Sequence, residues 1–278
     1  MSLFSILVIA LGWVISMIYE DSSLVLLAVF IAIFLNIFSY WFSDKIVLRL
    51  HKAKPASRGD YFDLWNATEN LAITAGLPMP KLFVIEDSSP NAFATGRNAE
   101  HAVIAVTTGL LKILDKNELE GVIAHELSHI GNRDMLLSTI IVILAGFIAL
   151  LSDFFLRSRQ FGDRRNGGNG LAIIGIALAI LAPLAATLIR LAISRKREFL
   201  ADATGALLTR YPEGLASALR KISASSAPPM HTANDATAHL FISNPFGNKN
   251  SKFHKLFLTH PPIEERIRAL IDANDRGI

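Results

Sequence analysis

Two histidines and a glutamate within one short segment are the residues best suited to metal-assisted hydrolysis. His125 and His129 are four positions apart, and Glu126 directly follows the first of them, in the pattern His-Glu-x-x-His. On an α-helix, residues four apart lie on one face, so both imidazoles can bind the same ion. The neighbouring carboxylate can then reach a water molecule on that ion. The pattern therefore indicates a metal-activated hydrolase.

The flanking residues predict that this segment is helical. Asp115 and Glu118 have the spacing of a capping box, and Gly131 is a typical helix end. With the histidines that this chain contains, the pattern arises by chance in about 1% of such sequences. A solvated helix with two surface histidines is the alternative interpretation. A third metal ligand elsewhere in the chain would decide between them.

Glu198 is the candidate for this third ligand. A catalytic zinc site needs three protein ligands and an open position for water, and the absence of cysteine leaves histidine and carboxylate as ligands. Asp202 follows four residues later on the same helical face, where it can hydrogen-bond a ligating imidazole. The alternative for Glu198 is an ion pair with Arg195 or Lys196. We expect one zinc ion per chain.

Four apolar runs must position these ligands. Hydrophobic residues make up 51% of the 278 residues and charged residues only 18%, a composition too apolar for an ordinary soluble domain. Each run approaches the ~17–25 residues that a membrane-spanning helix needs. The runs cover residues 3–18, 24–42, 135–155 and 171–193. A cleaved signal peptide is the alternative for the first run, but no Lys or Arg precedes it and no small-x-small cleavage site follows it.

The basic residues predict how these spans are oriented. A group of Lys and Arg residues follows the second run, whereas only Glu20 and Asp21 separate the first two runs. Because cytoplasmic loops carry an excess of Lys and Arg, the segment after the second run is expected in the cytoplasm. Two further crossings then return Glu198 to the face that carries the histidines. The arginines of the loop at 157–165 disagree with this rule, which leaves open whether the last two runs cross fully.

The sequence therefore predicts a multi-pass α-helical membrane protein with a cytosolic α+β metallopeptidase domain. The peptidase domain is divided between two segments of the chain, and each segment follows a transmembrane hairpin. The hairpins are residues 1–43 and 135–193, and the parts of the peptidase domain are residues 44–134 and 194–278.

Three stretches of the first peptidase segment are candidate strands. Residues 81–86 and 101–107 are rich in β-branched residues, which favour strands. Residues 91–96 lie between them and form either a short edge strand or a loop.

The whole chain resembles the bacterial HtpX-type membrane zinc metalloproteases, relatives of the type I CAAX prenyl proteases and the Oma-type peptidases. The resemblance includes the N-terminal hairpin, the segment 91–96, the histidine motif and the Glu-x-x-x-Asp pattern. It continues through Asn244-Pro245-Phe246 and Thr259-His260-Pro261-Pro262 to Glu265-Arg266.

This resemblance implies a zincin-like (gluzincin) fold in which Glu198 binds zinc. It also implies that a substrate backbone pairs with the segment Asn91, Ala92, Phe93 and Ala94 by strand addition. His260 lies near the active site in such proteins. It either stabilises the oxyanion of the reaction or packs at the start of the final helix.

The expected activity is hydrolysis of peptide bonds in misfolded or damaged membrane proteins, as part of a stress response. Glu126 would take a proton from the zinc-activated water and pass it to the leaving amine. The expected location is the cytoplasmic (inner) membrane of a bacterium, with the active site facing the cytoplasm. The sequence contains no phosphate-binding Gly-x-x-x-x-Gly-Lys loop, so we expect no use of ATP. Its cations adjoin apolar runs, which suits a lipid bilayer better than nucleic acid.

Two other classes of protein fit the sequence less well. An intramembrane zinc protease places the motif inside a span, but Lys116 and Glu120 open the motif helix and Arg133 closes it. A metal transporter or scaffold buries ionisable residues within its spans. These runs contain almost none beyond Asp153 and Arg190.

Overall fold

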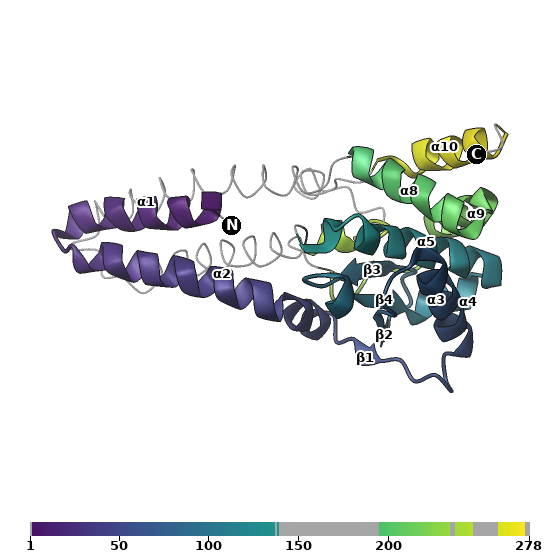
Figure 1. Cartoon of the computed structure of the whole chain (residues 1–278), viewed down its shortest axis with the longest axis horizontal. Helices are drawn as coiled ribbons and strands as arrows, with labels where there is room; N and C mark the ends of the chain where they lie inside the picture. The colour runs from purple at the N-terminus through teal and green to yellow at the C-terminus, as the bar shows by residue number, and fades with distance from the viewer. Residues whose placement is uncertain (1, 137, 139–194, 234–236, 247–260, 276–278) are drawn as a thin grey trace.

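The computed structural model describes residues 2–136, 138, 195–233, 237–246 and 261–275 (Figure 1). Most of the predicted spans over residues 135–155 and 171–193 lies outside the described residues, and so does His260.

A helical hairpin begins the chain and projects from an α/β body (Figure 1). Helix α1 (Ser2–Tyr19) packs along helix α2 (Ser23–Leu50). Gly12 permits this close approach, because a Cβ there would lie 2.2 Å from the Cβ of Ala28. The amide of Asn36 also donates a hydrogen bond to the Ser5 hydroxyl across the hairpin, at 2.7 Å.

Within the described residues, α2 contains the one helical stretch that is long and apolar enough to cross a membrane. This stretch is Ser23–Phe42, with a mean hydropathy of 2.4. Its large apolar side chains point outward, and Leu26 and Phe30 are 73% and 67% exposed. Such a surface is suited to contact with lipid.

The body is built on a four-stranded sheet with the order β1-β2-β4-β3. β2 and β4 are parallel, and β1 and β3 pair antiparallel with their neighbours. The strands are β1 (Lys54–Pro55), β2 (Lys81–Ile85), β3 (Ala92–Thr95) and β4 (Val103–Thr107). The predicted strand at 81–86 is confirmed, the one at 101–107 begins only at Val103 because residues 99–101 form a 3-10 turn, and the segment 91–96 contains an edge strand rather than a loop.

Helices cover one face of this sheet and enclose the main core. α5 packs against β3, α3, α8 and α9, and α10 packs against α8 and α9. The helices of the body are α3 (Phe62–Ala75), α4 (Thr108–Ile113), α5 (Lys116–Gly131), α8 (Arg195–Thr209), α9 (Pro212–Ala224) and α10 (Ile263–Asp275), with short 3-10 turns η1 (Ala99–His101) and η2 (Ala238–Leu240).

The central helix α5 carries the histidine motif and begins where the sequence predicts. The Asp115 side chain accepts from the Glu118 backbone N–H, and the Glu118 side chain accepts from the Asp115 N–H, which is a complete capping box. Buried apolar residues such as Val122, Ile123 and Leu127 fix the helix against its neighbours. The motif therefore lies on the best-packed helix of the body.

Candidate metal centre

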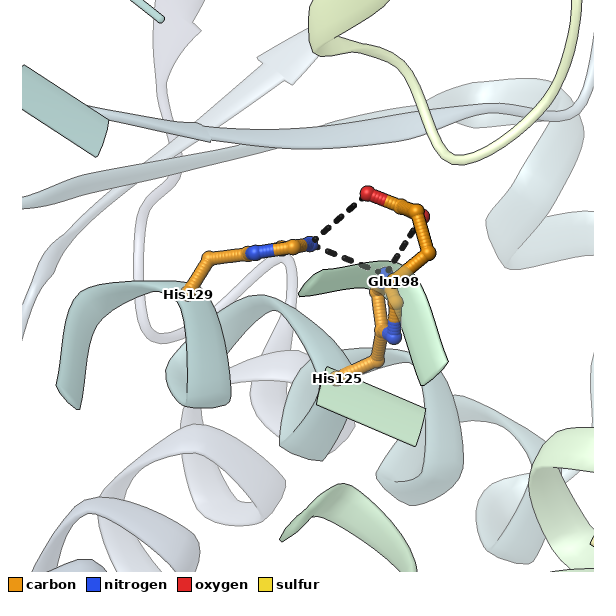
Figure 2. A group of neighbouring side chains, drawn as sticks. All are labelled: His125, His129 and Glu198. Carbon is orange, nitrogen blue, oxygen red and sulfur yellow. Dashed lines mark hydrogen bonds and ion pairs between the residues drawn. The ribbon is translucent and has the colours of Figure 1, made fainter. Parts of the chain in front are cut away.

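Three predicted ligand side chains converge on one point between α5 and α8 (Figure 2). The Nε2 atoms of His125 and His129 are 3.2 Å apart. One carboxylate oxygen of Glu198 lies 3.6 Å from Nε2 of His129, and the other lies 3.9 Å from Nε2 of His125. Gly205 of α8 allows this arrangement. A Cβ at this position would lie 3.0 Å from the backbone N of His125, and because glycine has none, α8 can lie directly against α5.

These three side chains fit a divalent ion. Two nitrogen ligands at ~2.0–2.1 Å from a tetrahedral zinc are about 3.3 Å apart, which matches the separation of the two imidazoles. The three ligands and Glu126 line a cavity of about 30 Å³. A water molecule needs at least ~10–15 Å³ measured in this way, so the cavity has room for an ion and one small ligand. Two imidazoles and one carboxylate are also a typical set of ligands for catalytic zinc.

Glu126 belongs to the same cavity and is only 2% exposed. It follows His125 on α5, so it reaches the space beside the ligands rather than the space between them. This is the position in which a carboxylate can exchange a proton with a bound water molecule.

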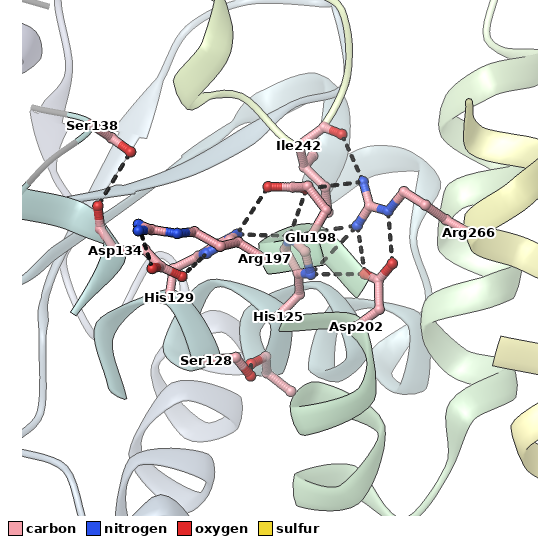
Figure 3. A network of polar contacts seen from close by, with 11 residues as sticks. His125, Ser128, His129, Asp134, Ser138, Arg197, Glu198, Asp202, Ile242 and Arg266 are labelled. Atoms are coloured by element: carbon pink, nitrogen blue, oxygen red, sulfur yellow. Dashed lines mark hydrogen bonds and ion pairs between the residues drawn. The ribbon is translucent and has the colours of Figure 1, made fainter. Parts of the chain in front are cut away.

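Asp202 and Arg266 hold the ring of His125 from behind (Figure 3). Oδ1 of Asp202 lies 2.9 Å from Nδ1 of His125. Arg266 donates to both carboxylate oxygens of Asp202, at 2.6 and 2.8 Å. Burial alone would raise the pKa of Asp202, but the Arg266 cation and the bond to His125 lower it to about 2. A charged Asp202 favours the tautomer of His125 that leaves Nε2 free for a metal.

Asp134 and Arg197 form a similar pair behind His129. Oδ2 of Asp134 lies 3.2 Å from Nδ1 of His129, and Arg197 donates to the other oxygen of Asp134 at 3.0 Å. Each imidazole of the site is thus oriented by a carboxylate that an arginine holds in turn.

The two imidazoles differ in their affinity for a proton. Burial lowers the pKa of His125 to about 4, and the Arg266 cation acts in the same direction. Burial also lowers the pKa of His129, but the bond to Asp134 and the charge of Glu198 outweigh it and raise that pKa to about 9. The surroundings of His129 therefore favour a positive charge, which a metal cation would supply.

The predicted substrate segment reaches this cavity at one residue. Ala94 lines the metal cavity. Phe93 is fully buried against Phe241, and the backbone carbonyl of Ala92 accepts a hydrogen bond from Ile242 at 3.0 Å. Asn91 binds the backbone of a neighbouring loop through its side chain.

No role for Arg197, Arg266 or Asp134 was predicted from the sequence. Arg197 is adjacent to the predicted ligand Glu198, and Asp134 comes five residues after His129. Both are therefore close in sequence to predicted site residues, but neither spacing is the three or four residues that share a helical face. Arg266 lies 64 residues from Asp202, so only the tertiary structure identifies its partner.

This chain is similar to known proteins over most of its length. The sequence model of Peptidase family M48 matches residues 63–274. A protein named Protease HtpX homolog from Thermoanaerobacter pseudethanolicus is 50% identical over 277 residues, covering 96% of this chain and 91% of that relative. A Protease HtpX homolog from Pyrococcus furiosus is 53% identical over 249 residues, covering 88% of this chain and 85% of that relative.

A solved structure is similar in fold. The crystal structure of Ste24p from S. mikatae superimposes with a TM-score of 0.53 at 22% identity, and the match covers 87% of this chain. The present chain spans 57% of the Ste24p chain. The resemblance predicted from sequence motifs is thereby confirmed. This chain belongs to peptidase family M48 and is a metalloprotease.

Proposed function

We propose that this chain is a membrane-bound zinc endopeptidase that cleaves misfolded or damaged membrane proteins. The observation that carries the proposal is the convergence of His125, His129 and Glu198 beside the buried Glu126. The apolar helix α2 on the same chain supports attachment to a membrane. Similarity to relatives named as proteases supports a polypeptide substrate.

Zinc is the proposed metal, held by His125, His129 and Glu198. The available ligands are nitrogen and carboxylate oxygen, and the chain has no cysteine. When bound, zinc would polarise the scissile carbonyl and lower the pKa of a bound water towards ~7.

Glu126 is proposed to take the proton of the attacking water and to pass it to the leaving amine. Its burial excludes bulk water, so the proton stays within the site. Asp202 keeps the ring of His125 fixed while the charge in the site changes. Ala94 is the proposed residue of the predicted pairing segment that meets the substrate backbone. His260, which precedes α10, is proposed to donate a hydrogen bond to the oxyanion.

The proposed topology has four spans and an active site that faces the cytoplasm. The hairpin of residues 1–43 and the hairpin of residues 135–193 would hold the protein in the inner membrane of a bacterium. Residues 44–134 and 194–278 would then form one peptidase domain. The packing of α8 against α5 supports this division.

The test compares the wild type with Glu126→Gln on a detergent-solubilised model membrane protein. Gln keeps the size of the side chain but cannot accept the proton. The rate of cleavage should therefore fall by about 10²–10⁴-fold while zinc remains bound. Glu120→Gln, on the same helix but outside the cavity, is the matched control and should cleave normally. The measurements are the mass of the fragments and the zinc content per chain. Full activity of Glu126→Gln would contradict the proposal.

A further inference from the structure

Among the described residues, only part of the outer hydrogen-bonding edge of β3 has a partner. In an antiparallel pair, alternate residues direct their backbone groups towards the partner strand or away from it. The N–H of Thr107 donates to the carbonyl of Asn91 at 2.9 Å, so Asn91, Phe93 and Thr95 face β4. The backbone groups of Ala92 and Ala94 therefore face away from β4, at the outer edge of the sheet.

The Ala92 end of this edge is already covered. Ile242 donates its N–H to the carbonyl of Ala92, and Arg266 donates to the carbonyl of Ile242 at 3.3 Å. The next residue, Ser243, is bound by the side chain of Asn91. The Asn91 side-chain oxygen accepts from the Ser243 backbone N–H, and the Asn91 amide donates to the Ser243 carbonyl. An extended peptide can therefore pair with β3 only from Ala94 towards the end of the strand.

That end of the strand leads to a second cavity, which we call the Met135 cavity. It measures about 470 Å³, and Met135 lines both this cavity and the metal cavity. Its walls come from the segment that follows α3, from the segment that follows β3, and from the end of α5 with the residues beyond it. They are Leu77, Arg97–Glu100, Ile130, Gly131, Arg133, Met135 and Leu136. A peptide that extends from the metal along β3 therefore passes this cavity.

The walls of the Met135 cavity are suited to a large apolar side chain. Leu77, Ile130 and Leu136 provide apolar surface. Arg97 also lines the cavity; its guanidinium lies 2.6 Å from Nε2 of His101 and 4.4 Å from the ring centroid of Trp41. With Arg133, the cavity is lined by two cations and one carboxylate, that of Glu100. The excess of cations disfavours a Lys or Arg side chain.

We propose that the Met135 cavity binds a large apolar side chain of the substrate, next to the bond that is cleaved. This subsite rests on the proposed function and adds the chemical class of one substrate position. The occupant is part of the polypeptide being cut, because Met135 lines both this cavity and the metal cavity, and the cavity begins at Arg97, two residues beyond the end of β3. The site thereby sets the cleavage preference of the enzyme.

Gly131 provides a direct way to fill the cavity. A Cβ at Gly131 would meet one described atom, Cδ1 of Leu77, at the ordinary contact distance of 3.7 Å. Gly131→Phe therefore adds a ring to the cavity without backbone strain. Gly59→Phe is the matched control, because a Cβ at Gly59 meets nothing within 4 Å. Leu136→Ala is a second variant, which enlarges the cavity instead of filling it.

The experiment profiles the cut sites of each full-length protein with a mixture of unstructured peptides, read by mass spectrometry. For the wild type and Gly59→Phe we expect large apolar residues to be enriched at one position beside the cut. Gly131→Phe should lower kcat/KM for these peptides about tenfold relative to peptides with a small residue there. Leu136→Ala should shift the preference towards larger side chains. Zinc content and thermal unfolding identify any variant that has not folded.

Three results would overturn the inference. The first is an unchanged preference in a folded Gly131→Phe or Leu136→Ala protein. The second is an equal loss of activity on every peptide, which would indicate that the cavity holds something other than substrate, such as a lipid chain. The third is the absence of cleavage by the wild type and Gly59→Phe alike, which would refute the proposed function and this subsite with it.

Discussion

At the scale of single residues, the site consists of two imidazoles, each held by a carboxylate and an arginine. His125 is held by Asp202 and Arg266, and all three are buried. On the other side, the Arg197 that holds Asp134 has a side chain that is 37% exposed. A buried charge that loses its partner costs much more free energy than an exposed one. The two arginines should therefore differ in importance although their geometry is similar.

Replacing Arg266 with Met should lower the free energy of unfolding by about 3–5 kcal/mol, because the charge of Asp202 would be buried without a counterion. Zinc affinity should also fall, by about 10–100-fold, because the ring of His125 loses its support. Arg197→Met is the matched comparison and should cost less, because Arg197 is itself partly exposed and the buried Asp134 is left more accessible to water than Asp202 and keeps its contact with His129. Urea unfolding in detergent and zinc titration measure both effects. Equal losses in the two variants would contradict the distinction.

At the scale of elements, the site depends on how closely α8 approaches α5. Glu198 and Asp202 are on α8 and both histidines are on α5, so the distance between the helices sets the distance between the ligands. Gly205 determines this distance, since its position faces the backbone of His125. The small residue has a steric function at this contact and no chemical function in the site.

Gly205→Ala should separate the two helices by a few tenths of an ångström, because the new Cβ would lie 3.0 Å from the backbone N of His125. Overpacking of this kind costs about 1–3 kcal/mol, and zinc affinity should fall as Glu198 moves away from the histidines. Gly131→Ala, at the end of α5, has space for its Cβ and should be neutral. Thermal unfolding and zinc titration compare the two variants. A neutral Gly205→Ala would show that α8 is positioned by other contacts.

The sequence predicts these elements to different extents. The start of α5 and the strands β2 and β4 follow from local signals, namely a capping box and β-branched runs. The pairing of Ile242 with β3 could not be predicted, because it joins segments that are about 150 residues apart and carries no local pattern. The role of Arg266 could not be predicted either, because an arginine on a short helix is expected at the surface until its buried partner Asp202 is known. Local order was predictable, and so was the meeting of Glu198 and Asp202 with the histidine motif, but the contacts of Ile242 and Arg266 were not.

At the scale of the whole molecule, the end of the apolar helix α2 is joined to the peptidase body at His51. This residue is fully buried, and its two ring nitrogens lie 2.9 and 3.0 Å from the hydroxyls of Thr232 and Thr237. Its ring also packs against Phe93 of the edge strand and against Phe241. The proposed membrane hairpin and the substrate edge therefore share one buried contact.

This contact should make stability depend on pH. Burial lowers the pKa of His51 to about 4, below its ordinary value of about 6.5 in the unfolded chain. The unfolded state therefore binds more protons between these two values, so the stabilising effect is complete above pH ~6.5 and is lost as the pH falls towards about 4. The loss due to His51 is on the order of 3 kcal/mol.

The check is urea unfolding of the wild type and of His51→Gln at pH 7 and at pH 5. Gln can replace the hydrogen bonds but does not titrate, so the variant should lose less stability than the wild type on acidification. The difference between the two proteins isolates His51 from the other groups that titrate in this range. An identical pH dependence would contradict a neutral, buried imidazole at the end of α2.

The most direct test of the account is zinc K-edge X-ray absorption on the wild type and on Glu198→Ala, each in detergent. For the wild type we expect one zinc per chain, with two imidazoles and oxygen ligands at ~2.0–2.1 Å. In Glu198→Ala the two imidazoles should remain in the spectrum of any zinc still bound, with zinc affinity greatly reduced. A wild-type spectrum with other than two imidazoles, or a Glu198→Ala protein with unchanged affinity and spectrum, would contradict the proposed metal centre.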